Sequence, residues 1–144
     1  MLMIELPIRV DSDLAERVEA SYSEAIAKVG EDELTCIQSK LPRILADLRR
    51  GAQDWQSEVA LTAAAIFQVY KDPESMGKVG DDSKATLLAA LFYLCNPYDI
   101  IPDRVRGTGF VDDAVVLNSC LRRIEEQAPV LSRKIAATMR NPQR

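Results

Sequence analysis

Three consecutive stretches decide the fold: ATLLAALFYLC at residues 85–95, NPYDIIPDRVRGTG at residues 96–109 and FVDDAVVL at residues 110–117. The first stretch contains a single polar residue, Thr86. A helix that is apolar on nearly every side is typical of the centre of a bundle, where other helices surround it. This stretch would span about 16 Å as a helix, which is too short for a hydrocarbon core of roughly 30 Å. We therefore expect a central core helix that does not cross a membrane.

The second stretch predicts an ordered turn that joins two core helices. Pro97 and Pro102 fix their φ angles and withhold two backbone donors, so the helix cannot continue through them. Gly109 permits a positive φ in the return of the chain. Asp112 and Asp113 then open the next helix, where negative charge is favoured by the partial positive charge of a helix N-terminus. A helical hairpin with a proline-stiffened connection follows.

Apolar residues recur at helical spacing along most of the chain beyond its first ten residues, which could be extended or a short strand. Asp13 and Glu16 have the spacing of a capping box, and Gly30 is placed to end the first helix in the left-handed conformation. Pro42 predicts a kink or break in the second helix. The predicted fold class is all-α, a compact bundle of five or six helices with a proline-rich ordered loop between the two core helices. The predicted helices cover about residues 13–29, 34–48, 53–71, 84–95, 110–127 and a short stretch from residue 129.

Composition excludes several kinds of chemistry. The chain has 144 residues, enough for one domain, and no histidine. It therefore lacks Ser-His-Asp and Cys-His catalysis, histidine-ligated zinc and an imidazole pH switch. The three cysteines, Cys36, Cys95 and Cys120, are widely separated in apolar helical surroundings, which indicates buried thiols in a reducing compartment. The first ten residues lack the pattern of a signal peptide, so we expect a cytoplasmic protein.

Charge is distributed unevenly along the chain. The net charge is -4, which disfavours a nucleic-acid partner. Residues 1–34 carry nine acidic and three basic residues, whereas residues 121–144 carry two acidic and six basic ones. This contrast is either ordinary solvated surface or the basis of head-to-tail association between copies.

The turn resembles the YkvA-like family, a bacterial domain of unknown function. Its hallmark is a turn of the form Tyr-x-x-x-Pro-x-Asp-x-Ile-Pro-Asp after a helix, then a glycine-containing link and an Asp-Asp pair that opens a second helix. The matching residues are Tyr93, Pro97, Asp99, Ile101, Pro102, Asp103, Gly109, Asp112 and Asp113. Within a single helical domain of residues 1–144, the resemblance makes residues 59–126 a YkvA-like helical core. It leaves residues 1–58 as N-terminal helices without a family and with a role that the sequence does not reveal.

Two arginines distinguish this chain from the family pattern. Arg104 and Arg106 stand where family members often have an apolar residue or proline. Some relatives look membrane-associated, but the arginines and the short apolar run argue against insertion here. Both arginines are also candidates for ion pairing with the neighbouring aspartates.

The four aspartates of the motif allow two interpretations. Asp99, Asp103, Asp112 and Asp113 offer the oxygen ligands that Mg²⁺ or Ca²⁺ prefers, which would permit a metal-dependent hydrolase. Alternatively they stabilise the start of a helix and pair with arginine, and no cofactor is needed. We expect the architectural role and keep the metal site as the alternative.

The sequence names no specific activity. It leaves an enzymatic role open but favours a non-catalytic one: a small soluble helical interaction or regulatory module whose partner is another protein or a second copy. A metal-dependent hydrolase is the second interpretation. A protein that attaches to a membrane surface, without a transmembrane segment, is the third.

Overall fold

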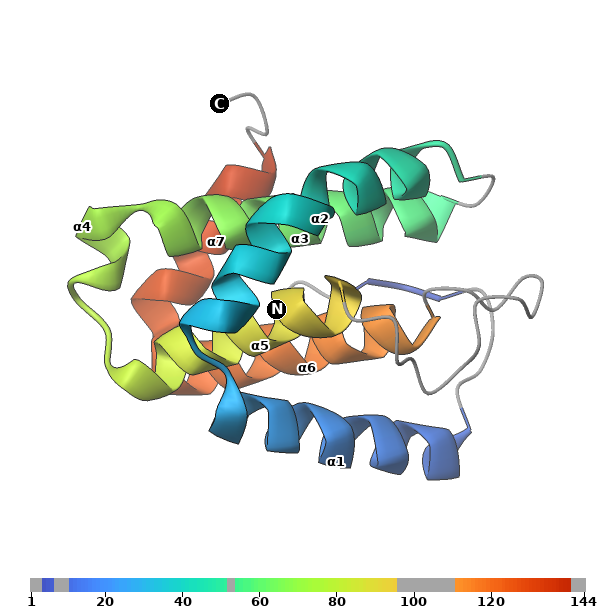
Figure 1. The fold of residues 1–144 in the computed structure, drawn as a ribbon, viewed down its shortest axis with the longest axis horizontal. Coiled ribbons are helices and arrows are strands. Elements are labelled where there is room, and N and C mark those ends of the chain that lie inside the picture. Colours follow the sequence, from blue (N-terminus) through green and yellow to red (C-terminus); the bar gives the residue numbers. More distant parts are fainter. Residues whose placement is uncertain (1–3, 7–10, 52–53, 96–110, 141–144) are drawn as a thin grey trace.

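The computed structural model describes residues 4–6, 11–51, 54–95 and 111–140. Within these ranges the regular elements are seven helices and no strand, which confirms the all-α class (Figure 1). The helices are α1 (Ser12–Lys28), α2 (Glu31–Arg49), α3 (Asp54–Lys71), α4 (Pro73–Met76), α5 (Asp81–Cys95), α6 (Val111–Gln127) and α7 (Pro129–Arg140). The helix beyond the five or six expected is α4, a single turn in the connection between α3 and α5.

Helix α5 lies at the centre of the bundle, as its uniformly apolar sequence predicts. It contacts α1, α2, α3 and α6, and α6 runs beside it in the opposite direction (Figure 1). Leu87 and Leu91 are completely buried. Burial of such side chains contributes roughly 1.5–3 kcal/mol each. The hairpin of α5 and α6 therefore carries much of the core, and the motif residues 96–110 that join these two helices lie outside the described residues.

Helix α3 packs between α2 on one side and α7 on the other. Its inner surface buries Trp55, Val59 and Ile66, and α7 contributes Leu131 and Ile135 to the same core. Alanines along α3 leave room for its neighbours to approach closely. The region before the motif thus forms one hydrophobic core with the region after it.

Two predicted helix ends are wrong. The N-cap of α1 is Asp11, whose carboxylate accepts a hydrogen bond from the backbone N–H of Asp13 at 3.2 Å, so Asp13 does not form the expected capping box with Glu16. Gly30 has an extended backbone, with φ of -158°, instead of the left-handed conformation. It is the N-cap of α2, and its N–H donates to the carboxylate of Glu33 at 2.7 Å. Two residues lie between the helices: Val29 is the C-cap of α1, and Gly30 opens α2.

Of the kink or break predicted at Pro42, the break does not occur, because α2 is continuous from Glu31 to Arg49. Proline removes one backbone donor, but the bonds of the neighbouring turns remain. The apolar residues on both sides, Ile37, Leu41 and Leu48, are buried in the core. Tertiary packing of this apolar face holds the helix together across the missing bond.

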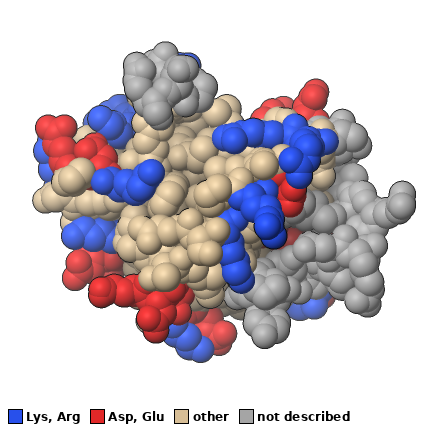
Figure 2. All heavy atoms as spheres, turned by 45° about the horizontal axis from the view of Figure 1, so that its top comes forward, with Lys and Arg blue, Asp and Glu red and all other residues tan. Residues whose placement is uncertain are grey.

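Charged side chains are segregated on the surface. Figure 2 shows lysines and arginines on both sides of a broad uncharged area, while most of the acidic side chains in that view lie at the left and lower left, with a few at the upper right. The chain's net charge of -4 therefore conceals surfaces of opposite sign.

Candidate functional site

Two predicted site residues, Tyr93 in α5 and Asp112 in α6, are buried in the core and contact each other. Tyr93, near the end of α5, donates a hydrogen bond from its hydroxyl to a carboxylate oxygen of Asp112 at 3.2 Å. Asp112 is completely buried, and Tyr93 is only 6% exposed. A buried polar group is costly unless it has a partner, so this bond ties the end of one core helix to the beginning of the next.

Asp113 lies beside Asp112 in the first turn of α6 and is also buried. Both carboxylates stand where the partial positive charge of the helix N-terminus favours an anion. Within the described parts of the chain, no three histidine, cysteine, aspartate or glutamate side chains come close enough together to hold a metal ion. The other motif residues, Pro97, Asp99, Ile101, Pro102, Asp103, Arg104, Arg106 and Gly109, lie outside the described residues. The four-aspartate metal site therefore remains a prediction.

The thiols are poorly suited to nucleophilic chemistry. Burial is the main reason that the pKa values of Cys95 and Cys120 are each raised to about 12. The thiolate is the reactive form, so at neutral pH both groups stay protonated. All three cysteines are free, and Cys36 is the one that is only partly buried.

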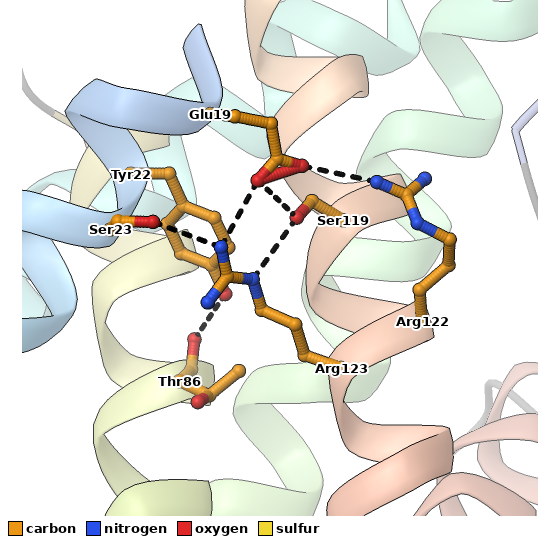
Figure 3. Close-up of polar contacts among 7 residues, drawn as sticks. All are labelled: Glu19, Tyr22, Ser23, Thr86, Ser119, Arg122 and Arg123. Carbon is orange, nitrogen blue, oxygen red and sulfur yellow. Dashed lines mark hydrogen bonds and ion pairs between the residues drawn. The ribbon is translucent and has the colours of Figure 1, made fainter. Parts of the chain in front are cut away.

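A polar cluster joins α1 to α6 (Figure 3). The carboxylate of Glu19 lies between two guanidinium groups, at 3.0 Å from Arg122 and 3.1 Å from Arg123. The hydroxyl of Ser119 donates to the same carboxylate at 3.0 Å. Partial burial raises the pKa of Glu19, but these hydrogen bonds and positive charges outweigh it, and the net pKa is lowered. We call this set of four residues the Glu19 cluster.

The Glu19 cluster continues inward through an aromatic side chain. The guanidinium of Arg123 lies over the ring of Tyr22, at 5.1 Å from its centroid, and also donates to the hydroxyl of Ser23 at 3.0 Å. Tyr22 is completely buried, and its hydroxyl donates to the backbone carbonyl of Thr86 in α5 at 2.7 Å. Helix α1 is thus fixed to both core helices by polar contacts (Figure 3).

The N-terminal segment is held by one asparagine. Ile4 is buried, and its N–H donates to the side-chain oxygen of Asn118 at 2.7 Å. The side-chain nitrogen of Asn118 donates to the carbonyl of Ile4 at 3.0 Å. The side-chain amide of Asn118 therefore bonds to both backbone polar groups of Ile4, as a neighbouring β-strand would. Sequence reasoning missed both this contact and the Glu19 cluster, because the partners are separated by about 100 residues or more.

A pocket of about 350 Å³ lies between the connection after α4 and the start of α7. Its lining combines the basic residues Lys78 and Lys134 with Glu74, and Ser83 donates to the side chain of Gln127 at its edge. Lys134 also lies 4.0 Å from the carboxylate of Asp72. Because charges of both signs surround this hollow, it has no pronounced preference for one kind of ligand.

The fold and the buried Tyr93–Asp112 contact define a helical bundle built around the α5–α6 hairpin. Residues 83–118, which cover most of α5 and the beginning of α6, match the family described as "Protein of unknown function (DUF1232)". This match, with the relative described next, confirms the YkvA-like character that the motif predicts for this part of the chain. No function follows from the family description.

A relative from Bacillus subtilis (strain 168) is named "Uncharacterized membrane protein YkvA". It is 43% identical over 54 residues, which make up 36% of this chain and 51% of the relative. The chain thus matches about half the length of this curated relative. No solved structure matches the chain. None of the described helices combines the length and apolar character that a membrane span requires.

Proposed function

We propose that the chain is a non-catalytic interaction module, a rigid helical bundle that acts through its surface. The observation that carries the proposal is that polar side chains in or near the core bond one helix to another. The hydroxyls of Tyr93 and Tyr22 and the carboxylate of Glu19 all make contacts between helices. These groups contribute to architecture, and the hollow that Glu19 lines with Ser119 and the two arginines is open to the surface.

The chemistry of the remaining residues supports the same proposal. The chain has no histidine, and the raised pKa values of Cys95 and Cys120 keep both thiols protonated at neutral pH. The three free cysteines fit a reducing compartment, and we propose that the protein works on the cytoplasmic side.

A membrane surface is the attachment site that we favour. The name of the Bacillus relative calls that protein a membrane protein. This chain matches about half of the relative, so the attribution to this chain is a proposal. A protein partner or a second copy is the alternative attachment, and a metal-dependent hydrolase that uses the motif aspartates is the alternative activity.

Fractionation tests this function. We expect the protein, expressed in a bacterial host, to sediment with the membranes and to be released by high salt, because peripheral attachment depends on exposed charges. Recovery in the soluble fraction at every ionic strength would contradict membrane attachment. Calorimetric titration with Mg²⁺, Mn²⁺ and Ca²⁺ is expected to give no binding heat. Binding together with hydrolytic turnover, both lost in Asp112→Asn, would replace the interaction module by a metal-dependent hydrolase.

A further inference from the structure

Two helices concentrate positive charge in a chain whose net charge is negative. From residue 40 to residue 50, along the second half of α2, four exposed basic residues stand against one acid, Asp47. Helix α7 carries three exposed basic residues and no acid. Each of the two segments therefore has a net charge of +3, while the whole chain has -4. We call these seven residues the basic face: Lys40, Arg43, Arg49, Arg50, Arg133, Lys134 and Arg140.

The surface between these two segments is uncharged over most of its length. Helix α3 contacts both α2 and α7. Its outer residues Ser57, Leu61, Ala64 and Gln68 follow one another at intervals of four, three and four, which places them in a line along one side of the helix. Figure 2 shows the result, a broad uncharged area with lysines and arginines on either side of it.

Few acids counteract the basic face. Asp47 pairs with Arg50, and Asp72 lies 4.0 Å from Lys134. Asp54 and Glu58 are exposed at the beginning of α3. Within the described residues, five of the seven basic side chains have no ion-pair partner, namely Lys40, Arg43, Arg49, Arg133 and Arg140. These five remain available to an external anion.

We propose that the basic face docks on the anionic phospholipid headgroups of a membrane surface. This inference rests on the membrane attachment proposed above and specifies its location and lipid chemistry. Among the described residues Val130 is the one large apolar side chain that is strongly exposed, so this part of the surface offers charge to a membrane and no large apolar anchor. A second copy, which could present the exposed acids of its α1 and α2, is the alternative occupant that the test below distinguishes.

Vesicle flotation tests the proposal with the full chain. The vesicles contain phosphatidylcholine alone or phosphatidylcholine mixed with phosphatidylglycerol. Each basic side chain near an anionic surface changes the partition coefficient by about fivefold. We expect binding only to the mixed vesicles, about 25-fold weaker binding for Lys40→Gln/Arg43→Gln, and a similar loss for Arg133→Gln/Arg140→Gln. The matched control is Arg17→Gln/Lys28→Gln, which removes the same charge from exposed positions on α1 and should bind as the wild type does.

Four outcomes would overturn the proposal. They are equal binding to both kinds of vesicle, an equal loss in the control, binding to a DNA duplex as strong as binding to the mixed vesicles, and salt-sensitive self-association in sedimentation velocity that the basic-face variants abolish. Circular dichroism checks that each variant is folded. If the protein sediments with native membranes but not with the mixed vesicles, the lipid inference fails while membrane attachment through another partner stands.

Discussion

Helices α5 and α1 are held in the bundle by different physical means. Helix α5 is surrounded by apolar side chains from four other helices, and most of its own residues are buried. Helix α1 buries only Val18 and Tyr22 completely and depends in addition on the polar contacts of Tyr22 and Glu19. The comparison teaches that apolar packing forms the core of this bundle, while polar contacts decide how the outer helix is attached. Substitutions in α5 and in α1 test this difference.

The largest effect is expected in α5. Leu91→Ala removes a completely buried side chain and leaves a cavity, which should lower the free energy of unfolding by about 2–5 kcal/mol. Val130→Ala is the control, because Val130 is 64% exposed and its truncation should change stability by less than about 0.5 kcal/mol. Chemical denaturation monitored by circular dichroism measures both. Equal effects of the two substitutions would contradict the central position of α5.

Tyr22→Phe tests the buried polar contact of α1. The substitution keeps the aromatic ring but removes the hydroxyl that donates to the carbonyl of Thr86. We expect a loss of about 1–2 kcal/mol, because a buried acceptor loses a partner. Hydrogen exchange should show that the opening of α1 becomes easier while the protection of α5 changes less. A uniform loss of protection across the bundle would argue against a separately attached helix.

The Glu19 cluster predicts a smaller effect that depends on pH. The pKa of Glu19 is lowered in the folded protein, so its contribution is present above the ordinary glutamate pKa and is lost as the pH falls through the lowered value. Glu19→Gln should cost about 1 kcal/mol or less at neutral pH, since the ion pairs are partly exposed. Denaturation measured from neutral to acidic pH should show that the difference between variant and wild type shrinks in acid. A constant difference would mean that the charge of Glu19 is unimportant.

The sequence predicts the apolar part of this comparison better than the polar part. Residues 85–95 by themselves indicate a buried helix, because Thr86 is the one polar residue in this run. Arg123 and Glu19 give no such sign, since each is typical of a solvated helix surface and their contact depends on how α1 docks. Local capping is intermediate: the sequence predicts a helix start near Asp13, but the N-cap of α1 is Asp11. The motif predicts Tyr93, Asp112 and Asp113 as site residues. It does not predict that they are buried, because their burial depends on how the helices pack.

Thiol reactivity gives the smallest and simplest comparison. Cys95 and Cys120 are buried, with pKa values raised to about 12, whereas Cys36 is only partly buried. We expect Ellman's reagent to label Cys36 first in the native protein, and all three thiols only after denaturation. Cys36→Ser is the control that should remove the early reaction. Rapid labelling of the remaining thiols in that variant would show that the core opens readily.

Our central claim is that Asp112 and Asp113, at the start of α6, stabilise the fold and do not hold a metal ion. Thermal unfolding of the wild type and Asp112→Asn, each with and without millimolar Mg²⁺ or Ca²⁺, tests it most directly. We predict that the substitution lowers the unfolding midpoint because it alters the buried contact with Tyr93, and that neither cation changes either midpoint. A cation-dependent rise in the wild type that disappears in Asp112→Asn would contradict the claim and make this region a metal site.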